Sequence, residues 1–322
     1  MAAVAAADPA APDGTRARLP DATGFVEREG VRVFWERYGA GSPTILLMPT
    51  WSIFSSRHWK HQIPYLARHF RVVTFDGRGN GRSDRPLDPA AYADTEFVTD
   101  AAAVLDATGT DRAVVAGLSM GGGYALRFAI DLPDRALALI VVGGAVGGRD
   151  RPEGTPDVPD DPDFEEPRDP LADDGWGRYN AHFWRQDWPA FAEWFVGTRI
   201  LSEPHSTKPI EDGIGWALAT EPEAMVASRR APYLRRPAEW PVPPSTEGRG
   251  LAFARRVRCP ALVIHGRDDQ IIGLENARRV AAEMGGRLVE IDGGGHAPIL
   301  REPVLVNLLI RDFVQRLPGG SA

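Results

Sequence analysis

The sequence predicts an α/β fold with a mainly parallel central sheet and helices on both of its faces. Short, continuously apolar runs such as TILLM at 44–48 and RVVTF at 71–75 are typical of strands buried on both faces. Segments with helical spacing alternate with these runs, and such alternation is typical of parallel sheets. A glycine-rich turn around Ser119 follows a further apolar run, and ligands bind at the carboxyl ends of the strands in such sheets.

The first elements expected are a β-hairpin and a helix between two buried strands. Residues 24–29 and 31–38 alternate apolar and polar side chains, as the strands of a hairpin do. Apolar residues at helical spacing predict a helix over 59–69, between the two strands named above. His58, which directly precedes this helix, is expected to be a surface histidine.

The later elements continue the alternation of strands and helices. The patterns predict, in chain order, a helix over 97–107, a strand over 112–118, a helix over 122–132, a strand over 137–142, a helix over 251–257 and strands over 261–265 and 287–291. The alternation stops between the strand at 137–142 and the helix at 251–257, so the core sheet is expected to be interrupted there.

The interruption predicts an inserted helical cap over 147–250. That stretch holds 20 acidic against 12 basic residues and six of the nine tryptophans. Its first part, 150–174, is dense in Asp, Glu and Pro and is expected to be an exposed, mobile excursion. The core would then consist of residues 21–146 and 251–322, preceded by a disordered leader over 1–20.

An aromatic stripe in the cap predicts part of a substrate pocket. Four large rings recur at helical spacing, and these are Trp184, Trp188, Phe191 and Phe195. A helix with this much aromatic surface must bury it against another surface. We therefore expect these side chains to be divided between the core of the cap and the lining of a pocket.

Composition excludes several classes of partner. The 322-residue chain has 43% hydrophobic and 25% charged residues and a net charge of −7, with no basic stripe, which argues against binding to nucleic acid or to anionic membranes. No apolar run is long enough to span a bilayer. The only cysteine, Cys259, has no partner for an internal disulfide, which favours a cytoplasmic location. The chain is expected to act on a small molecule as a monomer or a homodimer.

The turn GLSMG at 117–121 predicts a nucleophilic serine. It lies between the strand at 112–118 and the helix at 122–132. A tight strand-to-helix turn crowds the backbone, so only residues without a Cβ fit on either side of Ser119. The backbone N–H of Met120, at the start of the helix, would then face the position where an oxyanion forms.

An acid and a histidine follow two later strands. The strand at 261–265 leads to Asp268 and Asp269, and either carboxylate could accept the Nδ1–H of a histidine. The strand at 287–291 leads to three glycines and His296, and the glycines would make the loop flexible enough to bring the imidazole over the sheet. The order serine, acid, histidine differs from the orders of the chymotrypsin and subtilisin folds.

These motifs resemble those of the α/β-hydrolase family over roughly residues 24–318. The matching segments are FDGRGNGRSDRP at 75–86, GLSMG at 117–121, LVIHGRDD at 262–269 and GGGHAP at 293–298. The resemblance implies an α/β-hydrolase fold in which Ser119 is the nucleophile, Asp269 the acid and His296 the general base. The G-x-x-D pattern of the family selects Asp269 over Asp268.

One segment departs from the family pattern. Pro49 and Thr50 stand where the family usually has His-Gly, after the third strand. Proline has no N–H to donate, so the backbone N–H of Trp51 would be the second oxyanion donor beside that of Met120. The Trp51 ring would also form a wall of the acyl pocket.

The function expected is that of a cofactor-independent serine hydrolase. Its substrate would be a carboxylic ester with an apolar or aromatic group, and the acyl-enzyme would form on Ser119. The same triad could instead serve C–C bond hydrolysis, perhydrolysis, lyase chemistry or acyl transfer. A ligand-binding receptor without activity is a further alternative. The sequence has neither metal-ligand spacing nor a nucleotide-binding motif, so neither a metal nor a cofactor is expected.

Overall fold

The computed structural model describes residues 18–144, 146, 164–204, 207–233 and 249–318. Its centre is a single eight-stranded sheet in the order β1-β2-β4-β3-β5-β6-β7-β8. The strands are β1 (Ala22–Arg28), β2 (Val31–Tyr38), β3 (Thr44–Leu47), β4 (Arg71–Phe75), β5 (Ala113–Leu118), β6 (Ala136–Val142), β7 (Ala261–Gly266) and β8 (Arg287–Ile291). Only β2 pairs antiparallel with its neighbours, so the sheet is mainly parallel, as predicted.

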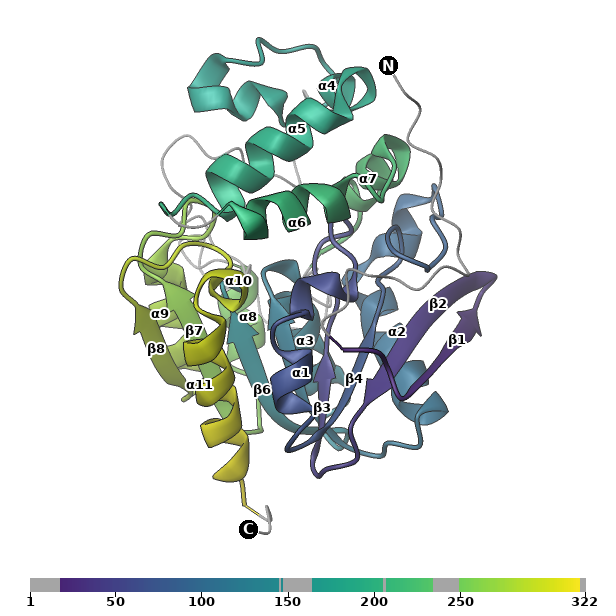
Figure 1. Ribbon diagram of the computed structural model, residues 1–322, viewed down its shortest axis with the longest axis vertical. Coiled ribbons are helices and arrows are strands. Elements are labelled where there is room, and N and C mark those ends of the chain that lie inside the picture. Colours follow the sequence, from purple (N-terminus) through teal and green to yellow (C-terminus); the bar gives the residue numbers. More distant parts are fainter. Residues whose placement is uncertain (1–17, 145, 147–163, 205–206, 234–248, 319–322) are drawn as a thin grey trace.

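Helices cover both faces of the sheet (Figure 1). One face packs against α1 (Ile63–Leu66), α10 (Pro298–Arg301) and α11 (Pro303–Gln315). The other packs against α2 (Asp94–Ala107), α3 (Met120–Asp131), α8 (Arg249–Ala254) and α9 (Leu274–Glu283). Successive strand residues point to opposite faces, so Ile45 and Leu46 of β3 are both buried, but in different clusters. This explains the unbroken apolar runs of the sequence.

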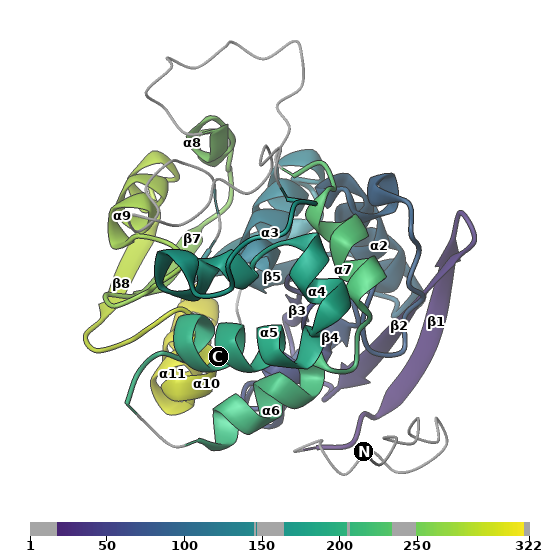
Figure 2. The same ribbon diagram turned by 90° about the horizontal axis from the view of Figure 1, so that it is seen from above.

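Further helices lie between β6 and β7 in the chain, and we call residues 164–204 and 207–233 the inserted segment. Its helices are α4 (Ala181–Gln186), α5 (Trp188–Phe195), α6 (Lys208–Ala217) and α7 (Pro222–Arg229), together with the 3-10 stretch η3 (Ala172–Arg178) and the π-helical turn η4 (Val196–Ile200). They lie above one end of the sheet in Figure 1, and the view from above in Figure 2 shows them crossing over it. β5 ends and α3 begins directly beneath them.

The sequence predicted the strands and the helices α2 and α3 to within a few residues, but it predicted neither α9 nor α11. The helix expected over 59–69 is wrong. The chain instead forms a short 3-10 turn, η1 (Ser56–Trp59), and then the single turn of α1. Pro64 stands in the first turn of α1. Because proline has no N–H and fits a helix only at its start, it prevents one continuous helix here.

Three sequence predictions fall partly outside the described residues. These are residues 1–17 of the expected leader, residues 150–163 of the expected acidic excursion, and residues 147–163, 205–206 and 234–248 of the expected cap. Within the described ranges, no helix combines the length and the hydropathy needed to cross a bilayer.

Candidate active site

The turn between β5 and α3 holds Ser119 in a backbone conformation that residues with side chains seldom adopt. Its φ is 54° and its ψ is −123°. A Cβ on Gly117 would overlap the carbonyl group of Gly121, and a Cβ on Gly121 would overlap the carbonyl oxygen of Pro49. Both glycines are therefore needed for the close approach of backbone to backbone, which is the reason the sequence pattern suggested.

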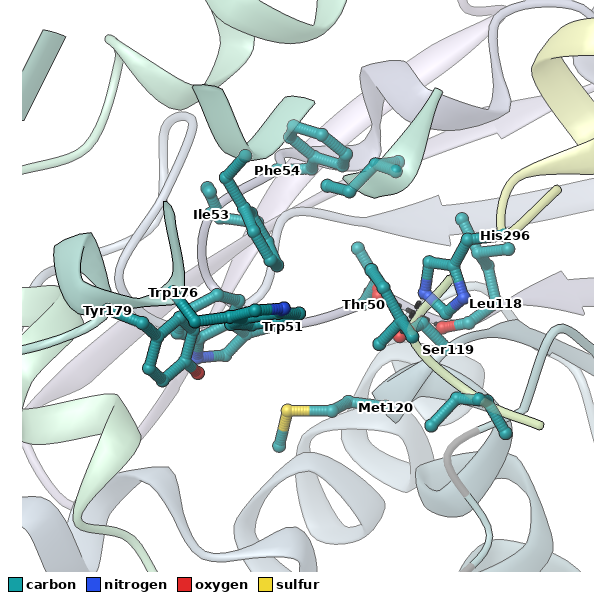
Figure 3. A pocket seen from close by; sticks show the side chains of 14 residues that line it. Thr50, Trp51, Ile53, Phe54, Leu118, Ser119, Met120, Trp176, Tyr179 and His296 are labelled. Carbon is teal, nitrogen blue, oxygen red and sulfur yellow. Dashed lines mark hydrogen bonds between the residues drawn. The ribbon is translucent and has the colours of Figure 1, made fainter. Parts of the chain in front are cut away.

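Ser119, His296 and Asp269 form one continuous chain of hydrogen bonds. The His296 Nε2 lies 2.9 Å from the Ser119 Oγ, and its Nδ1 lies 2.9 and 3.1 Å from the two carboxylate oxygens of Asp269. Figure 3 shows the imidazole beside the serine at one end of a cavity. Because an ionised carboxylate can only accept hydrogen bonds, Nδ1 carries the proton and Nε2 is free to accept the serine proton.

The neighbouring acids Asp268 and Asp269 have different surroundings. Asp268 is exposed, whereas Asp269 is buried and faces His296. The Oδ1 of Asp269 also accepts the backbone N–H groups of Ile271 and Ile272, at 2.8 and 2.9 Å. This local turn fixes the carboxylate orientation, so the geometry selects Asp269 as the partner of His296.

Burial and charge act in opposite directions on Asp269. Burial alone would raise the pKa of its carboxyl group, but the electrostatic attraction and hydrogen bond of His296, the electrostatic interaction with His265 and the N–H of Ile272 outweigh burial. The net effect holds the pKa of Asp269 below its usual value. The carboxylate is therefore ionised at neutral pH, as an acceptor for the Nδ1–H must be.

His265 is a second imidazole beside the same carboxylate, and it was not among the site residues predicted from the sequence. Its Nε2 lies 2.9 Å from the carbonyl oxygen of Ile272 and 3.4 Å from the Asp269 Oδ2. Burial lowers the pKa of His265, which keeps the ring neutral. Because the carbonyl only accepts, the Nε2 carries the proton and ties the Asp269 turn to β7. The spacing of His265 and Asp269, four residues apart at a strand end, was the available signal.

The glycines before His296 meet specific backbone requirements, one by its φ and two by close contacts, rather than simply making the loop flexible as the sequence suggested. Gly293 has a φ of 68°, in the left-handed region that glycine favours. A Cβ on Gly294 would lie 2.9 Å from the Cγ2 of Ile291, and a Cβ on Gly295 would lie 2.5 Å from the Oε1 of Glu203. The loop is thus held by its contacts, which fixes the direction of the imidazole.

The predicted oxyanion donors, Met120 and Trp51, lie at the start of α3 and in the loop after β3, on either side of Ser119. Met120 is the first residue of α3, where a backbone N–H has no helical acceptor. The hydroxyl of Thr50 donates to the carbonyl oxygen of Leu118 at 2.9 Å, which ties the loop after β3 to the end of β5. Met120 and Trp51 both line the cavity beside Ser119.

A mostly apolar cavity of about 100 Å³ opens at the Ser119 hydroxyl. Aromatic side chains gather at the end away from His296 (Figure 3). The lining residues are Thr50, Trp51, Ile53, Phe54, Leu118, Ser119, Met120, Trp176, Tyr179, Phe195, Ile200, Ile271, Ile272 and His296. Among the apolar walls, the sequence predicted only Trp51 and Phe195, because most of the other walls come from loops and short turns without a periodic pattern.

Three of the four cap residues predicted as pocket lining do not line the cavity, and these are Trp184, Trp188 and Phe191. Trp184 is fully buried, with its ring centroid 5.0 Å from that of Phe191. The indole N–H of Trp188 donates to the carbonyl oxygen of Ala217 at 3.0 Å. These three rings pack in the core of the inserted segment. Of the four predicted rings, Phe195, at the end of α5, is the one that lines the cavity.

Two other residues, His58 and Cys259, are unsuited to catalysis because of burial, and the burial of His58 contradicts the sequence prediction. His58 is completely buried, not at the surface, and its Nδ1 lies 2.7 Å from the carbonyl oxygen of Ser55. Burial lowers the pKa of His58 to about 4. Burial also raises the pKa of the Cys259 thiol, which disfavours the nucleophilic thiolate. Among the described residues, no three His, Cys, Asp or Glu side chains are grouped as metal ligands would be.

The chain belongs to the α/β hydrolase fold family, whose pattern matches residues 43–303. Solved structures of this fold resemble the protein over most of its length. A bromoperoxidase from Bacillus anthracis superposes with a TM-score of 0.70 at 21% identity, covering 91% of this chain and 100% of the other. A thermophilic esterase from Thermogutta terrifontis superposes with a TM-score of 0.67 at 24% identity, covering 91% and 97%. At these identities the similarity shows the fold alone.

Sequence relatives have names that describe different hydrolases. A 2-hydroxymuconate semialdehyde hydrolase from Pseudomonas sp. (strain CF600) is 29% identical over 91% of this chain and 93% of its own. A bifunctional esterase/perhydrolase from Acinetobacter calcoaceticus is 25% identical over 89% and 98%. A protein of Azorhizobium caulinodans, provisionally named a carbamate hydrolase, is 36% identical, but the match spans only 35% of this chain and 41% of that protein. The names of these three relatives agree on hydrolysis and differ in substrate.

Proposed function

We propose that the protein is a serine hydrolase that cleaves carboxylic esters with an apolar group through an acyl-enzyme on Ser119. The observation that carries the proposal is the continuous hydrogen-bonded chain from the Ser119 Oγ through His296 to Asp269, at the end of an apolar cavity. A serine with a histidine acceptor and a buried, ionised orienting acid is the arrangement that activates a hydroxyl for attack on a carbonyl carbon.

The first half of the reaction forms the acyl-enzyme. The Nε2 of His296 takes the proton of Ser119 as its Oγ attacks the ester carbonyl carbon, and Asp269 stabilises the resulting imidazolium. The backbone N–H groups of Met120 and Trp51 would donate to the tetrahedral oxyanion. The alcohol then leaves with the proton from the imidazolium. In the second half, water loses its proton to His296 and attacks the acyl carbon, the bond from that carbon to the Ser119 Oγ breaks, and the imidazolium returns the proton to Ser119 as the acid leaves.

The cavity lining supports an uncharged, apolar substrate. Besides Ser119 and His296, its polar side chains are Thr50, Trp51, Trp176 and Tyr179, and no Lys or Arg is among the described residues that line it. The volume of about 100 Å³ favours a small acyl group, with the aromatic end stabilising it by contact.

C–C bond hydrolysis is the second candidate, because the relative from Pseudomonas sp. matches over 91% of this chain. A 2-hydroxymuconate semialdehyde carries a carboxylate, for which the described lining offers no Lys or Arg partner. Perhydrolysis would use the same acyl-enzyme with peroxide in place of water, as the name of the relative from Acinetobacter suggests for that protein. We favour ester hydrolysis because it needs only the residues in the cavity.

A substrate panel tests the proposal. Purified protein is assayed against p-nitrophenyl acetate, butyrate, hexanoate and benzoate, and against a thioester, a lactone and a vinylogous diketone. We expect turnover of the short esters, labelling of the peptide that contains Ser119 by a fluorophosphonate, and loss of both in Ser119→Ala. Turnover of the diketone alone would favour C–C hydrolysis. No turnover of any compound, together with ligand-induced stabilisation, would favour a receptor and overturn the proposal.

A further inference from the structure

A buried carboxylate of the inserted segment lies against the loop that holds His296. The Oε1 of Glu203 accepts the backbone N–H of Gly295 at 2.5 Å, and Gly295 directly precedes His296. Glu203 is only 7% exposed. As described above, a Cβ at Gly295 would lie 2.5 Å from the same oxygen, so a glycine is what allows the carboxylate to approach this closely.

Arg301 holds the same part of the inserted segment from the other side of His296. It lies in α10, and its Nη2 donates to the carbonyl oxygens of Leu201 and Glu203 at 3.1 and 3.2 Å. Its Nε lies 3.5 Å from the Oε2 of Glu203, and the two side chains are 2% and 3% exposed. Contacts from one short stretch, 201–203, therefore reach the chain both before and after His296.

This stretch also continues directly from a wall of the cavity. Phe195 and Ile200 line the cavity, and η4, which spans most of the chain between them, leads into Leu201. Other polar contacts between the inserted segment and the core, such as that of Lys60 with Asp212, lie far from His296 in the sequence and involve none of its neighbours. Of the contacts described, those of Glu203 and Arg301 connect the cavity wall to the His296 loop.

A buried carboxylate is costly to desolvate, so its position calls for an explanation beyond packing. A loop contact one residue from His296 controls the distance from the imidazole to Ser119, and a misplacement of about 1 Å can lower a rate by about 100-fold. We propose that Glu203 is a positioning residue, which holds the Gly295–His296 backbone so that the imidazole stays aligned with Ser119. This inference rests on the proposed function and extends it to a residue outside the triad.

Two substitutions separate the reach of the Glu203 side chain from its charge. Glu203→Gln keeps an oxygen at the same distance for the N–H of Gly295, whereas Glu203→Asp keeps the charge but is one methylene shorter. We expect Glu203→Asp to lower kcat for a short ester by about 10- to 100-fold with KM changed less than about threefold. Glu203→Gln should retain most of kcat, because it retains the hydrogen bond. Asp212→Asn is the control, since it removes the charge from another contact between the inserted segment and the core, that of Asp212 with Lys60.

Two readouts keep the test independent of the choice of substrate. The rate of Ser119 labelling by a fluorophosphonate should fall in Glu203→Asp by the same factor as kcat. The downfield proton resonance of the His296 Nδ1–H should weaken in Glu203→Asp and persist in Glu203→Gln and Asp212→Asn. If the wild-type protein cleaves no ester, the proposed function fails, but the labelling rate and the resonance still test the positioning. Wild-type labelling and resonance in Glu203→Asp, or an equal loss in Asp212→Asn, would overturn it.

Discussion

The carboxyl ends of the strands, which carry the Ser119 turn and are called the sheet edge below, hold their side chains differently from the inserted segment. At the sheet edge, backbone lies against backbone, as where Gly117 and Gly121 leave no room for a Cβ beside Ser119. In the inserted segment, aromatic rings pack on one another, with centroids of Phe191 and Phe195 5.3 Å apart. Backbone contacts at the edge fix positions to within fractions of an ångström, whereas a ring cluster can repack around a change in one member. The edge therefore suits the chemistry and the inserted segment suits substrate choice.

The largest expected effect comes from the edge. Asp269→Asn should lower kcat by about 1,000- to 10,000-fold, because an amide that offers its N–H group to His296 favours the wrong tautomer of the imidazole. Asp268→Asn, one residue away and exposed, should stay within about twofold of wild type. Steady-state kinetics on a short ester measures both. An equal loss in the two variants would show that the turn, and not the hydrogen bond to His296, is what matters.

The next prediction compares two phenylalanine rings of the inserted segment, Phe191 and Phe195, in their effects on stability and on acyl preference. Phe191 is fully buried and does not line the cavity, so Phe191→Ala should lower the free energy of unfolding by about 3–5 kcal/mol without changing acyl preference. Phe195 lines the cavity, so Phe195→Ala should raise kcat/KM for the hexanoate over the acetate by about tenfold.

Urea unfolding and the four-ester series measure these two quantities in both variants. Trp188→Phe is a control for acyl preference, which it should leave unchanged, since Trp188 belongs to the buried rings but lies outside the cavity lining. A change of acyl preference in Phe191→Ala as large as that in Phe195→Ala would mean that the ring cluster acts as one unit, and the division into core and lining would not hold.

The sheet edge was predictable from the sequence because its signals are local. Glycines on both sides of Ser119 report a backbone constraint within five residues, and strand ends place Asp269 and His296 at the same edge. The acid at 269 was chosen over that at 268 only through the family pattern, since burial of the one and exposure of the other depend on the tertiary fold.

The walls of the cavity were less predictable because they depend on contacts between distant segments. Helical spacing correctly indicated buried rings, but could not say which of them faces the cavity. Trp176 lies in η3 and Tyr179 directly follows it, and the backbone of η3 includes left-handed residues at Asp173 and Asp174 and follows no periodic pattern. Glu203 gave no signal at all, because its contact with Gly295 spans more than 90 positions in the sequence.

A smaller effect concerns pH and the buried His58, in the loop after β3. Its pKa is about 4 in the folded protein against 6.5 as the unperturbed value, so the unfolded chain binds more protons between these pH values. The stability associated with neutral His58 is complete above pH 6.5 and is lost as the pH falls toward 4, by about 3 kcal/mol in total.

Urea unfolding from pH 7.5 to 4.5 should therefore show a shallower loss of stability in His58→Gln than in wild type. His182, which is exposed on α4 of the inserted segment, provides the control substitution His182→Gln, expected to follow the wild-type curve. Parallel curves for His58→Gln and wild type would mean that His58 gains its proton without unfolding, for instance by a local opening of η1.

The smallest effect compares a glycine from each region. Gly121 faces the carbonyl oxygen of Pro49, so Gly121→Ala should destabilise the protein by about 1–3 kcal/mol and lower activity by shifting the loop that carries Trp51. Gly215 lies exposed within α6 with nothing within 4 Å of an added Cβ, so Gly215→Ala should stabilise the protein by about 0.5–1 kcal/mol, because alanine loses less backbone entropy in a helix. Unfolding midpoints and ester turnover measure both variants. Opposite signs would support the contrast between a backbone-limited edge and an adaptable inserted segment, and a destabilising Gly215→Ala would contradict it.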